Sequence, residues 1–176
     1  MSNTSKYKDI FRVPSNRLRV WDYSSNGYYF ITICVKDRKC VLGEIKDKKM
    51  FLSDIGNIIK EEWFQTSKIR SNVSLDEFVI MPNHIHGILI INSNVETSRR
   101  DVSTNKKLQP NSLGSIVGQF KSIATKRIRN IYPEFSWQPR YYDHIIRNEI
   151  SLQSIREYIR WNPFKWEIDE ENPSKS

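Results

Sequence analysis

The sequence predicts an α+β fold in which an antiparallel sheet is covered by helices. Two observations lead to this class. Short runs rich in β-branched and aromatic residues come in pairs separated by turns, and between the pairs lie segments whose apolar residues recur at helical spacing. The chain has 176 residues, of which 38% are hydrophobic and 27% are charged. This length and this balance suit one soluble domain with a hydrophobic core.

The first predicted strand covers residues 28–35, YYFITICV, after a turn at Asn26-Gly27. Large apolar side chains occupy both parities of this run, which is typical of a strand covered on both faces and therefore central in its sheet. A polar turn follows, and residues 40–45 are expected to form the strand that returns beside the first. The charged stretch 46–49 is expected to be another turn.

Residues 54–69 are predicted to form a helix, because Ser53 or Asp54 can cap it and its large apolar residues fall on one stripe. A hairpin is predicted after this helix. Its strands cover residues 75–81 and 84–91, and a tight turn at Pro82-Asn83 joins them.

The second half of the chain begins with residues 92–111, which are polar, basic and low in large apolar groups. We expect this stretch to be a mobile basic loop, since so long a segment without structure is unusual inside a compact domain. Residues 112–130 have apolar residues at helical spacing and are predicted to form the second helix, with Lys121 and Lys126 on its surface.

A short strand is predicted at residues 141–147 and a last helix at 149–161. Pro163 disfavours helical geometry at Asn162 and therefore ends this helix. The acidic tail, residues 167–176, is expected to fray. The predicted order, β-β-α-β-β-α-β-α, favours a sandwich of the ferredoxin-like type.

Composition and charge suggest the partner and the compartment. A basic arm, residues 1–27, precedes a single domain over residues 28–166, and the net charge of the chain is +8. A basic surface attracts polyanions, of which nucleic acid is the commonest. No run approaches the roughly 18 apolar residues of a membrane span, and the N-terminus lacks the apolar core of a signal peptide. We therefore expect a cytoplasmic protein that binds nucleic acid and no membrane.

Two of the three histidines, His84 and His86, lie two positions apart on a predicted strand. Residues at this spacing point to the same face, so both imidazoles can converge on one cation at a place that a ligand can reach. Imidazole suits Mn, Zn and Fe, and a site that handles phosphate adds Mg. Taken alone, the pair fits two polar residues at a strand edge better than a metal site.

The last helix offers further candidates in Tyr158 and Asn162, which are one turn apart and therefore neighbours on one face. Asn162 can give an amide oxygen to a metal, and Tyr158 can place a phenol beside it. Taken alone, Tyr158 fits a core aromatic on the stripe of Ile155 and Ile159, and Asn162 fits a cap before proline.

Longer segments change this interpretation. In order along residues 17–170, the segments YSSNGYYFITICVKDRKCVLGEI, MPNHIHGILII, SLGSIVGQFKSIATKRI, WQPRYYDHIIRNE and IREYIRWNPFKWEID resemble the REP-associated tyrosine transposases, part of the HUH class of single-tyrosine transposases and nucleases. The family's His-hydrophobic-His element matches His84, Ile85 and His86, and its Tyr-x-x-x-Asn pattern matches Tyr158 and Asn162. The resemblance implies that both pairs meet in one site of a ferredoxin-like HUH fold.

The resemblance also implies an activity. Such a protein cleaves and rejoins single-stranded DNA near hairpins, through a 5′-phosphotyrosine on Tyr158. A divalent metal, Mg²⁺ or Mn²⁺, would be held by His84, His86 and Asn162. The partner would be single-stranded DNA with hairpin structure, and the protein would act as a monomer or a homodimer.

Several basic, polar and aromatic residues are candidates for DNA contact, and His144 is included without a defined role. Tyr141 and Tyr142 are also rival nucleophiles that rank below Tyr158. The full set of DNA-binding candidates is Arg17, Arg19, Lys121, Lys126, Arg127, Gln138, Arg140, Tyr141, Tyr142 and His144.

Two other functions compete with the strand-transferase. A domesticated DNA-binding protein without strand transfer could have lost any residue of the predicted site, yet His84, His86, Tyr158 and Asn162 are all present. A metallohydrolase that uses water would need carboxylates around two metals, and the sequence pattern offers none there. The sequence therefore favours the enzyme that uses a tyrosine nucleophile.

Overall fold

A computed structural model describes residues 21–92, 111–169 and 171–173. The predicted contacts of Arg17, Arg19 and the basic loop lie outside the described residues, except for the ends of that loop at Asn92 and Asn111. The described elements are β1 (Gly27–Cys34), η1 (Lys36–Arg38), β2 (Gly43–Lys46), β3 (Lys49–Leu52), α2 (Asp54–Ile69), β4 (Val73–Ile80), β5 (His84–Ile91), α3 (Leu113–Ile128), β6 (Tyr142–Ile146), α4 (Glu149–Trp161) and η2 (Pro163–Ile168).

The main sheet has four strands in the order β4-β5-β1-β6, and every neighbouring pair is antiparallel. Because β5 lies between them, β4 runs parallel to β1, and α2 makes the crossover that connects them. In the same way α3 connects β5 to β6, which lie on either side of β1. This interleaving is that of a ferredoxin-like β-α-β-β-α-β sandwich. The predicted α+β class with an antiparallel sheet covered by helices is therefore confirmed.

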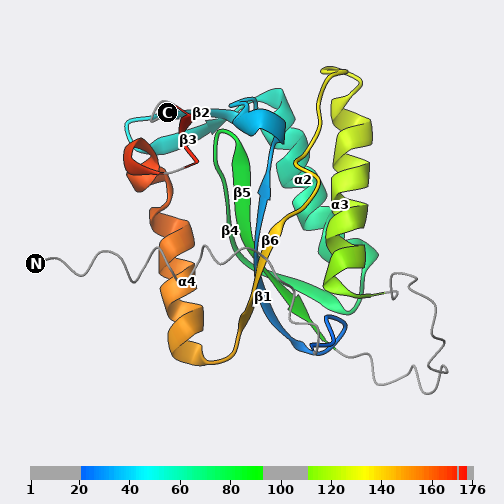
Figure 1. Cartoon of the computed structure of the whole chain (residues 1–176). Coiled ribbons are helices and arrows are strands. Elements are labelled where there is room, and N and C mark those ends of the chain that lie inside the picture. The colour runs from blue at the N-terminus through cyan, green and yellow to red at the C-terminus, as the bar shows by residue number, and fades with distance from the viewer. Residues whose placement is uncertain (1–20, 93–110, 170, 174–176) are drawn as a thin grey trace, which may run out of the picture.

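Helices cover both faces of the sheet. Figure 1 shows α2 and α3 on one face and α4 on the other. Alternate residues of β1 serve the two faces, as expected of a central strand. Tyr29, Ile31 and Ile33 enter the core under α2 and α3, whereas Phe30 joins a smaller core under α4 with Ile88. The same alternation along β5 decides which helix faces the histidines.

The sequence was wrong about the partner of the second strand. Residues 40–45 were expected to return beside β1, but β2 pairs with β3 in a separate two-stranded sheet, and β1 pairs with β5 and β6 instead. The turn at η1, where Asp37 and Arg38 have positive φ angles of 57° and 53°, precedes this hairpin. With β5 and β6 hydrogen-bonded on its two sides, β1 offers no free edge. Strand β3 was not predicted, because its first residue, Lys49, belongs to the charged stretch 46–49 that was expected to be a turn.

The helices lie where their apolar spacing and caps predict them. Helix α2 has the predicted bounds, and the Ser53 hydroxyl accepts a hydrogen bond from the Gly56 N–H at 3.1 Å. Ser112 caps α3 in the same way, by accepting from the Ser115 N–H. Helix α4 ends at Trp161 with Asn162 as its C-cap, at the predicted position. The predicted reason is wrong, because Asn162 keeps helical angles (φ −59°, ψ −45°) and the chain continues from Pro163 into η2.

Helix α4 is attached to β4 by two arginines. Arg156 donates to both carboxylate oxygens of Asp76, at 2.9 and 2.5 Å. Arg160 donates to Glu77, and both carboxylates lie at an irregularity of β4 between Leu75 and Phe78. A forked arginine fixes direction as well as distance. These pairs therefore hold the orientation of the helix that carries Tyr158.

Part of the acidic tail is packed. Arg38 pairs with Glu171 at 3.0 Å, and Asn172 is buried, with its amide donating to the Trp166 carbonyl at 3.0 Å. The expectation of a frayed tail is therefore wrong for residues 171–173. The reason is that short polar side chains bond back to the chain here, which composition alone does not reveal.

None of the helices in the described part of the chain is long and apolar enough to cross a membrane.

Gly87 follows His86 on β5 and faces the larger core on the other side of the sheet, where Trp63 lies. A Cβ atom at this position would lie 2.5 Å from a ring carbon of Trp63, whose side chain is only 2% exposed. We predict that Gly87→Ala lowers the free energy of unfolding by about 1–3 kcal/mol, the usual cost of overpacking a core. Gly118→Ala is the matched control, because its Cβ would meet nothing within 4 Å. In the middle of α3 it should add about 0.5–1 kcal/mol. Urea unfolding of both variants checks the prediction, and equal effects would contradict it.

Candidate functional site

The candidate site begins with two imidazoles that face each other on β5. His84 and His86 point to the α4 side of the sheet, and their Nε2 atoms are 3.0 Å apart. Ile85 between them enters the core on the other face. The prediction that both imidazoles share one face is confirmed. The prediction that a ligand reaches them directly is not, because the exposed fractions of His84 and His86 are 0% and 5%.

Asn83 decides the tautomer of His84. The Asn83 amide nitrogen donates to two backbone carbonyls, of Arg38 at 3.1 Å and of Glu171 at 2.6 Å. These bonds fix which end of the amide is the nitrogen, so Oδ1 is the atom 2.8 Å from His84 Nδ1. An amide oxygen only accepts, so His84 Nδ1 carries the proton and donates. His84 Nε2 therefore presents a lone pair toward His86.

The ring of His86 has partners on both nitrogens. Its Nδ1 lies 2.8 Å from the Thr32 hydroxyl oxygen, and its Nε2 lies 3.3 Å from the Tyr158 hydroxyl oxygen. A hydroxyl can donate or accept. Unlike Asn83, therefore, Thr32 leaves either tautomer of His86 possible.

Aromatic rings cover the pair. Phe30 stacks on His86 with ring centres 5.4 Å apart, Tyr158 meets the same imidazole at 5.2 Å, and Trp166 lies 6.2 Å from His84. Phe30 also meets the Tyr158 ring edge-on at 6.0 Å. Strand β1, helix α4 and the C-terminal η2 thus enclose the histidines and hold the phenol beside them.

Burial keeps both imidazoles neutral. It lowers the pKa of His84 to about 3, with a further contribution from the charge of Arg38. Burial likewise lowers the pKa of His86 well below its ordinary value, and His84 adds to the effect. A neutral imidazole has a free lone pair for a metal, whereas an imidazolium has none.

The residues present fit a divalent cation. Two ligands at about 2.1 Å from a metal on adjacent corners of an octahedron lie about 3.0 Å apart, and the two Nε2 atoms are 3.0 Å apart. Among the described residues no group of three or more His, Cys, Asp and Glu side chains could hold a metal, so a third ligand from this part of the chain would be of another kind. Asn162 supplies a candidate, because its buried Oδ1 has no hydrogen-bond partner in the part of the chain that the structure describes.

Three tyrosines were candidates for the nucleophile, and the structure separates them. The Tyr158 hydroxyl oxygen lies 3.3 Å from Nε2 of His86. Tyr142 lies opposite Thr32 on the same face of the sheet and packs against Phe30. Burial, and then the charge of Asp143, raises the pKa of Tyr142 to about 12. Tyr141 belongs to the other face, where it packs against the larger core.

The third histidine does not join the pair. His144 lies opposite Phe30 on β6, two positions along the sheet from the row that contains His86, Thr32 and Tyr142. Burial lowers its pKa, and Arg147 contributes. His144 is half-buried on the α4 face.

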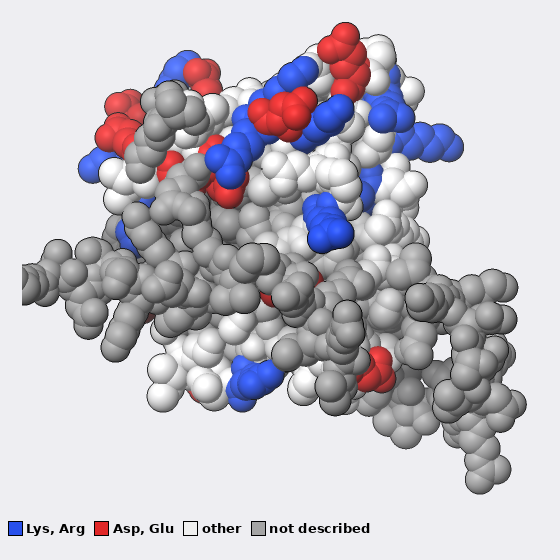
Figure 2. All heavy atoms as spheres, in the orientation of Figure 1, with Lys and Arg blue, Asp and Glu red and all other residues white. Residues whose placement is uncertain are grey.

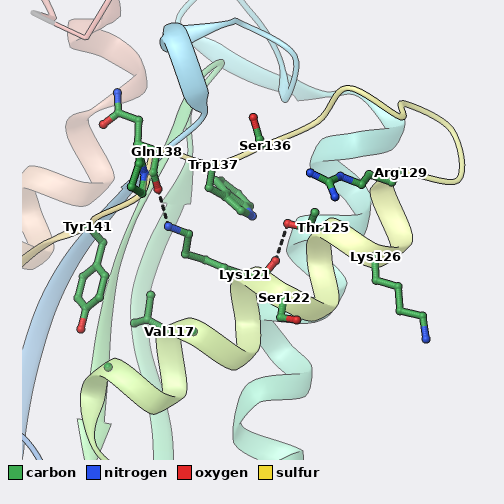
Figure 3. A pocket seen from close by; sticks show the side chains of 13 residues that line it. Val117, Lys121, Ser122, Thr125, Lys126, Arg129, Ser136, Trp137, Gln138 and Tyr141 are labelled. Carbon is green, nitrogen blue, oxygen red and sulfur yellow. Dashed lines mark hydrogen bonds between the residues drawn. The ribbon is translucent and has the colours of Figure 1, made fainter. Parts of the chain in front are cut away.

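A groove of about 800 Å³ lies on the opposite side of the sheet, between α3 and the segment that leads into β6. Figure 3 shows Lys121 reaching from α3 toward this segment, where its Nζ donates to the Gln138 carbonyl at 2.6 Å, while Lys126 extends away from it. The Trp137 side chain is 7% exposed and lines the groove, and its indole nitrogen has no partner among the described residues.

Lysine and arginine side chains gather along the C-terminal half of α3, on the side of the molecule that faces the viewer in Figure 2. Lys121, Lys126 and Arg129 line the groove. Arg127 does not line the groove. It forms ion pairs with Glu61 and Glu62 of α2, at 2.7 and 2.5 Å. The charge of Arg127 is thus compensated within the protein.

The remaining candidates for DNA contact lie near the same segment. Gln138 and Tyr141 line the groove, and Arg140 is exposed between them along the chain.

The sequence did not reveal the residues that support the histidines. Asn83 was interpreted only as a turn residue, although it directly precedes His84. Thr32 contacts His86 through a pairing of β1 with β5 that separates them by 54 positions in sequence. Trp166 lies near His84 because it belongs to η2, the 3-10 helix that follows α4. Of these, only the adjacency of Asn83 was a local signal.

Known proteins resemble this chain over most of its length. The family model described as "Transposase IS200 like" matches residues 23–162. A functionally uncharacterised protein of Haemophilus influenzae is 41% identical over 175 residues, which is 95% of this chain and 97% of that protein. A second protein of Haemophilus influenzae, which carries the name of a REP-associated tyrosine transposase, is 27% identical over 82% of this chain and 74% of its own length.

A solved structure has a similar fold. It is described as a REP-associated tyrosine transposase bound to a REP hairpin. The TM-score is 0.58 at 20% identity, and the match covers 80% of this chain and 68% of that one.

The neutral histidine pair predicts a pH dependence of stability. Below about pH 6.5 the unfolded chain takes up protons on both imidazoles, whereas the folded chain does not, because the pKa of each is lowered. Stability is therefore full above pH 6.5 and falls as the pH falls, by up to about 1.4 kcal/mol per pH unit for each histidine. Urea unfolding of the parent and of His86→Gln, both with chelator, should give the shallower dependence for the variant. Equal slopes between pH 6.5 and 5 would contradict this account.

Proposed function

The chain belongs to the IS200-like transposases, and we propose that it cuts and rejoins single-stranded DNA with Tyr158 as the nucleophile and a divalent metal beside it. One observation carries this proposal. The Tyr158 hydroxyl oxygen lies 3.3 Å from Nε2 of His86, which in turn lies 3.0 Å from Nε2 of His84. A phenol and two neutral imidazoles therefore converge from α4 and β5.

The metal would be held by the Nε2 atoms of His84 and His86 and by Oδ1 of Asn162. Mg²⁺ and Mn²⁺ are held mainly by oxygen ligands, such as the amide oxygen of Asn162 and the oxygens of a phosphate, and Mn²⁺ binds imidazole more readily than Mg²⁺ does. When bound, such an ion supplies charge that polarises the scissile phosphodiester and stabilises the departing oxygen.

Tyr158 would carry out a transesterification. Its hydroxyl oxygen bonds to phosphorus, the bond from phosphorus to the 3′-oxygen breaks, and the phenol proton passes to solvent while the 3′-oxygen takes up a proton. The products are a 5′-phosphotyrosine and a free 3′-hydroxyl. The phosphodiester is exchanged and not hydrolysed, so another 3′-hydroxyl can reverse the step and join strands without a nucleotide cofactor.

The protein favours this step by position. A free tyrosine has a pKa of about 10 and is mostly protonated at neutral pH, so the gain must come from holding the hydroxyl next to the phosphate. Arg156 and Arg160 anchor α4 on either side of Tyr158, through Asp76 and Glu77. The Phe30 ring packs edge-on against the Tyr158 ring.

The groove beside α3 would bind the DNA backbone. Lys121, Lys126 and Arg129 line it, and their charges would attract the phosphates. The similar solved protein is bound to a REP hairpin, which makes a hairpin with a single-stranded flank the partner to test. Arg140, Tyr141, Tyr142 and His144 follow the groove along the chain and would contact the strand that leads to Tyr158. Arg127, which two carboxylates already neutralise, would contribute less than we expected from sequence.

Tyr158→Phe tests the nucleophile, because it keeps the ring that packs against Phe30 and removes only the oxygen. We predict that this variant folds and binds DNA like the parent but forms neither a covalent adduct nor a cleavage product. The measurement is a denaturing gel of labelled single-stranded DNA from the flanks of the protein's own gene, incubated with Mg²⁺ or Mn²⁺.

Tyr142→Phe is the matched control, because Tyr142 packs against the same phenylalanine. This variant, like Tyr141→Phe, should still form the adduct. Peptide mapping of the trapped complex identifies the attached residue. DNA attached at position 141 or 142 would overturn the assignment of Tyr158, and the absence of any adduct in the parent would favour a protein that only binds DNA.

Lys126→Gln tests the groove. Lys126 is exposed on α3, so its loss should weaken hairpin binding without unfolding the protein. The slope of log affinity against log salt should become shallower by about 0.9 for each duplex phosphate contact that is lost. Lys60→Gln on α2 is the control, because Lys60 is also exposed but does not line the groove. Fluorescence anisotropy at several salt concentrations gives both slopes, and identical slopes would place the DNA elsewhere.

A further inference from the structure

We propose that Asn83 is a positioning residue that holds His84 in the one tautomer able to bind a metal through Nε2. This inference rests on the proposed function, since it assigns how the metal-binding state of the site is prepared before the metal arrives. Asn83 lies in the turn before β5, outside both the His-hydrophobic-His element and the Tyr-x-x-x-Asn pattern.

The first step of the argument is the orientation of the Asn83 amide. Asn83 is 1% exposed, so its polar atoms must find partners within the protein. Its nitrogen donates to the carbonyls of Arg38 and Glu171. A flipped amide would bring its oxygen against those two carbonyl oxygens and its nitrogen against His84. Two acceptor pairs facing each other in a buried place would be costly, so the observed orientation is strongly preferred.

The second step is what this orientation does to His84. Asn83 Oδ1 lies 2.8 Å from His84 Nδ1 and can only accept, which keeps the proton on Nδ1. The lone pair is then on Nε2, the atom that faces His86. The other tautomer would leave the buried Oδ1 without a donor and point an N–H where a cation would sit.

The third step is the contrast between the two histidines. His86 is held by the hydroxyl of Thr32, which can accept from Nδ1 or donate to it. Without a metal, His86 Nε2 can carry the proton that bridges to His84. With a metal, His86 can move that proton to Nδ1 without losing its partner. The pair therefore has one fixed and one adjustable member, so only one proton has to be displaced.

The fourth step is where the constraint on Asn83 originates. One of its two carbonyl partners belongs to η1 and the other to the tail, and Arg38 and Glu171 also form an ion pair at 3.0 Å. The docked tail thus contributes, through Asn83, to the protonation pattern of His84, although the carbonyl that Asn83 contacts lies 88 positions after Asn83 in the sequence.

Two substitutions distinguish positioning from simple structural support. Asn83→Ala removes the acceptor and both donated bonds, and Asn83→Asp keeps an acceptor for His84 Nδ1 but loses the donated bonds. Loss of an outer partner of a metal ligand usually costs about 10–100-fold in metal affinity. We expect a loss of this size for Asn83→Ala, and Asn83→Asp should stay closer to the parent. Asn72→Ala is the control, because Asn72 is a buried asparagine at the far end of the β4–β5 pair, and it should leave affinity unchanged.

The two readouts are Mn²⁺ affinity, followed by electron paramagnetic resonance of the free ion, and ¹⁵N NMR of the imidazoles in metal-free protein. Only three histidines contribute signals, so His86→Gln and His144→Gln variants assign them. The parent and Asn83→Asp should show His84 protonated on Nδ1, and Asn83→Ala should show a mixture of tautomers.

Three results would overturn the inference or what it rests on. An unchanged His84 tautomer in Asn83→Ala would overturn the role of Asn83. Equal losses of affinity in Asn83→Ala and Asn83→Asp would mean that Asn83 acts only by tying Arg38 and Glu171 together. If the parent binds no Mn²⁺, the proposed metal site fails, and the NMR result on metal-free protein still decides whether Asn83 sets the tautomer.

Discussion

The Nε2 atoms of His84 and His86 lie 3.0 Å apart in the buried layer between the sheet and α4. The surrounding structure depends on how the hydrogen-bonding needs of these two atoms are met. Neither ring can take a charge there, because burial holds both pKa values low. Two lone pairs facing each other repel, so either a shared proton or a cation must lie between them. The fixed acceptor on His84 and the adjustable hydroxyl on His86 permit both arrangements.

This contact explains why several distant segments are close together. Strand β5 supplies both rings, β1 supplies Thr32 from its neighbouring position, and α4 brings Tyr158 across the same face. The arginine pairs to β4 fix the helix, η2 adds Trp166, and the tail adds a carbonyl for Asn83. Thr32 and Asn83 bond to the imidazoles, the aromatic rings cover them, and the arginine pairs hold the helix that brings Tyr158. Under the proposed function, the small core beneath α4 would serve chemistry as well as stability.

The proposed site and the groove lie on opposite faces of the sheet, and β6 is the edge strand where these faces meet. Tyr141 lines the groove, whereas Tyr142 packs against Phe30 on the α4 face. A DNA molecule held in the groove would have to pass around β6 to reach Tyr158. The half-buried His144 and the exposed Arg140 lie along that route. This arrangement would let duplex binding and strand cleavage use different surfaces of one small domain.

Local patterns in the sequence predicted the helices, the β4–β5 hairpin and the shared face of His84 and His86, because caps and periodicity are properties of adjacent residues. They did not predict the β2–β3 hairpin, since two strands of four residues are too short for periodicity to identify. They also could not place Thr32 or Trp166 beside the histidines, because the register of the strands and the position of η2 are set by tertiary packing. The packed end of the tail depended on a buried asparagine pairing with carbonyls, for which composition gives no sign.

The central claim is that His84 and His86 form one half of a metal site. The most direct test is electron–nuclear double resonance of Mn²⁺ bound to protein labelled with ¹⁵N-histidine. The account predicts hyperfine coupling to two histidine nitrogens in the parent and to one in His84→Gln. Coupling to no histidine nitrogen, with Mn²⁺ bound elsewhere or not at all, would contradict it.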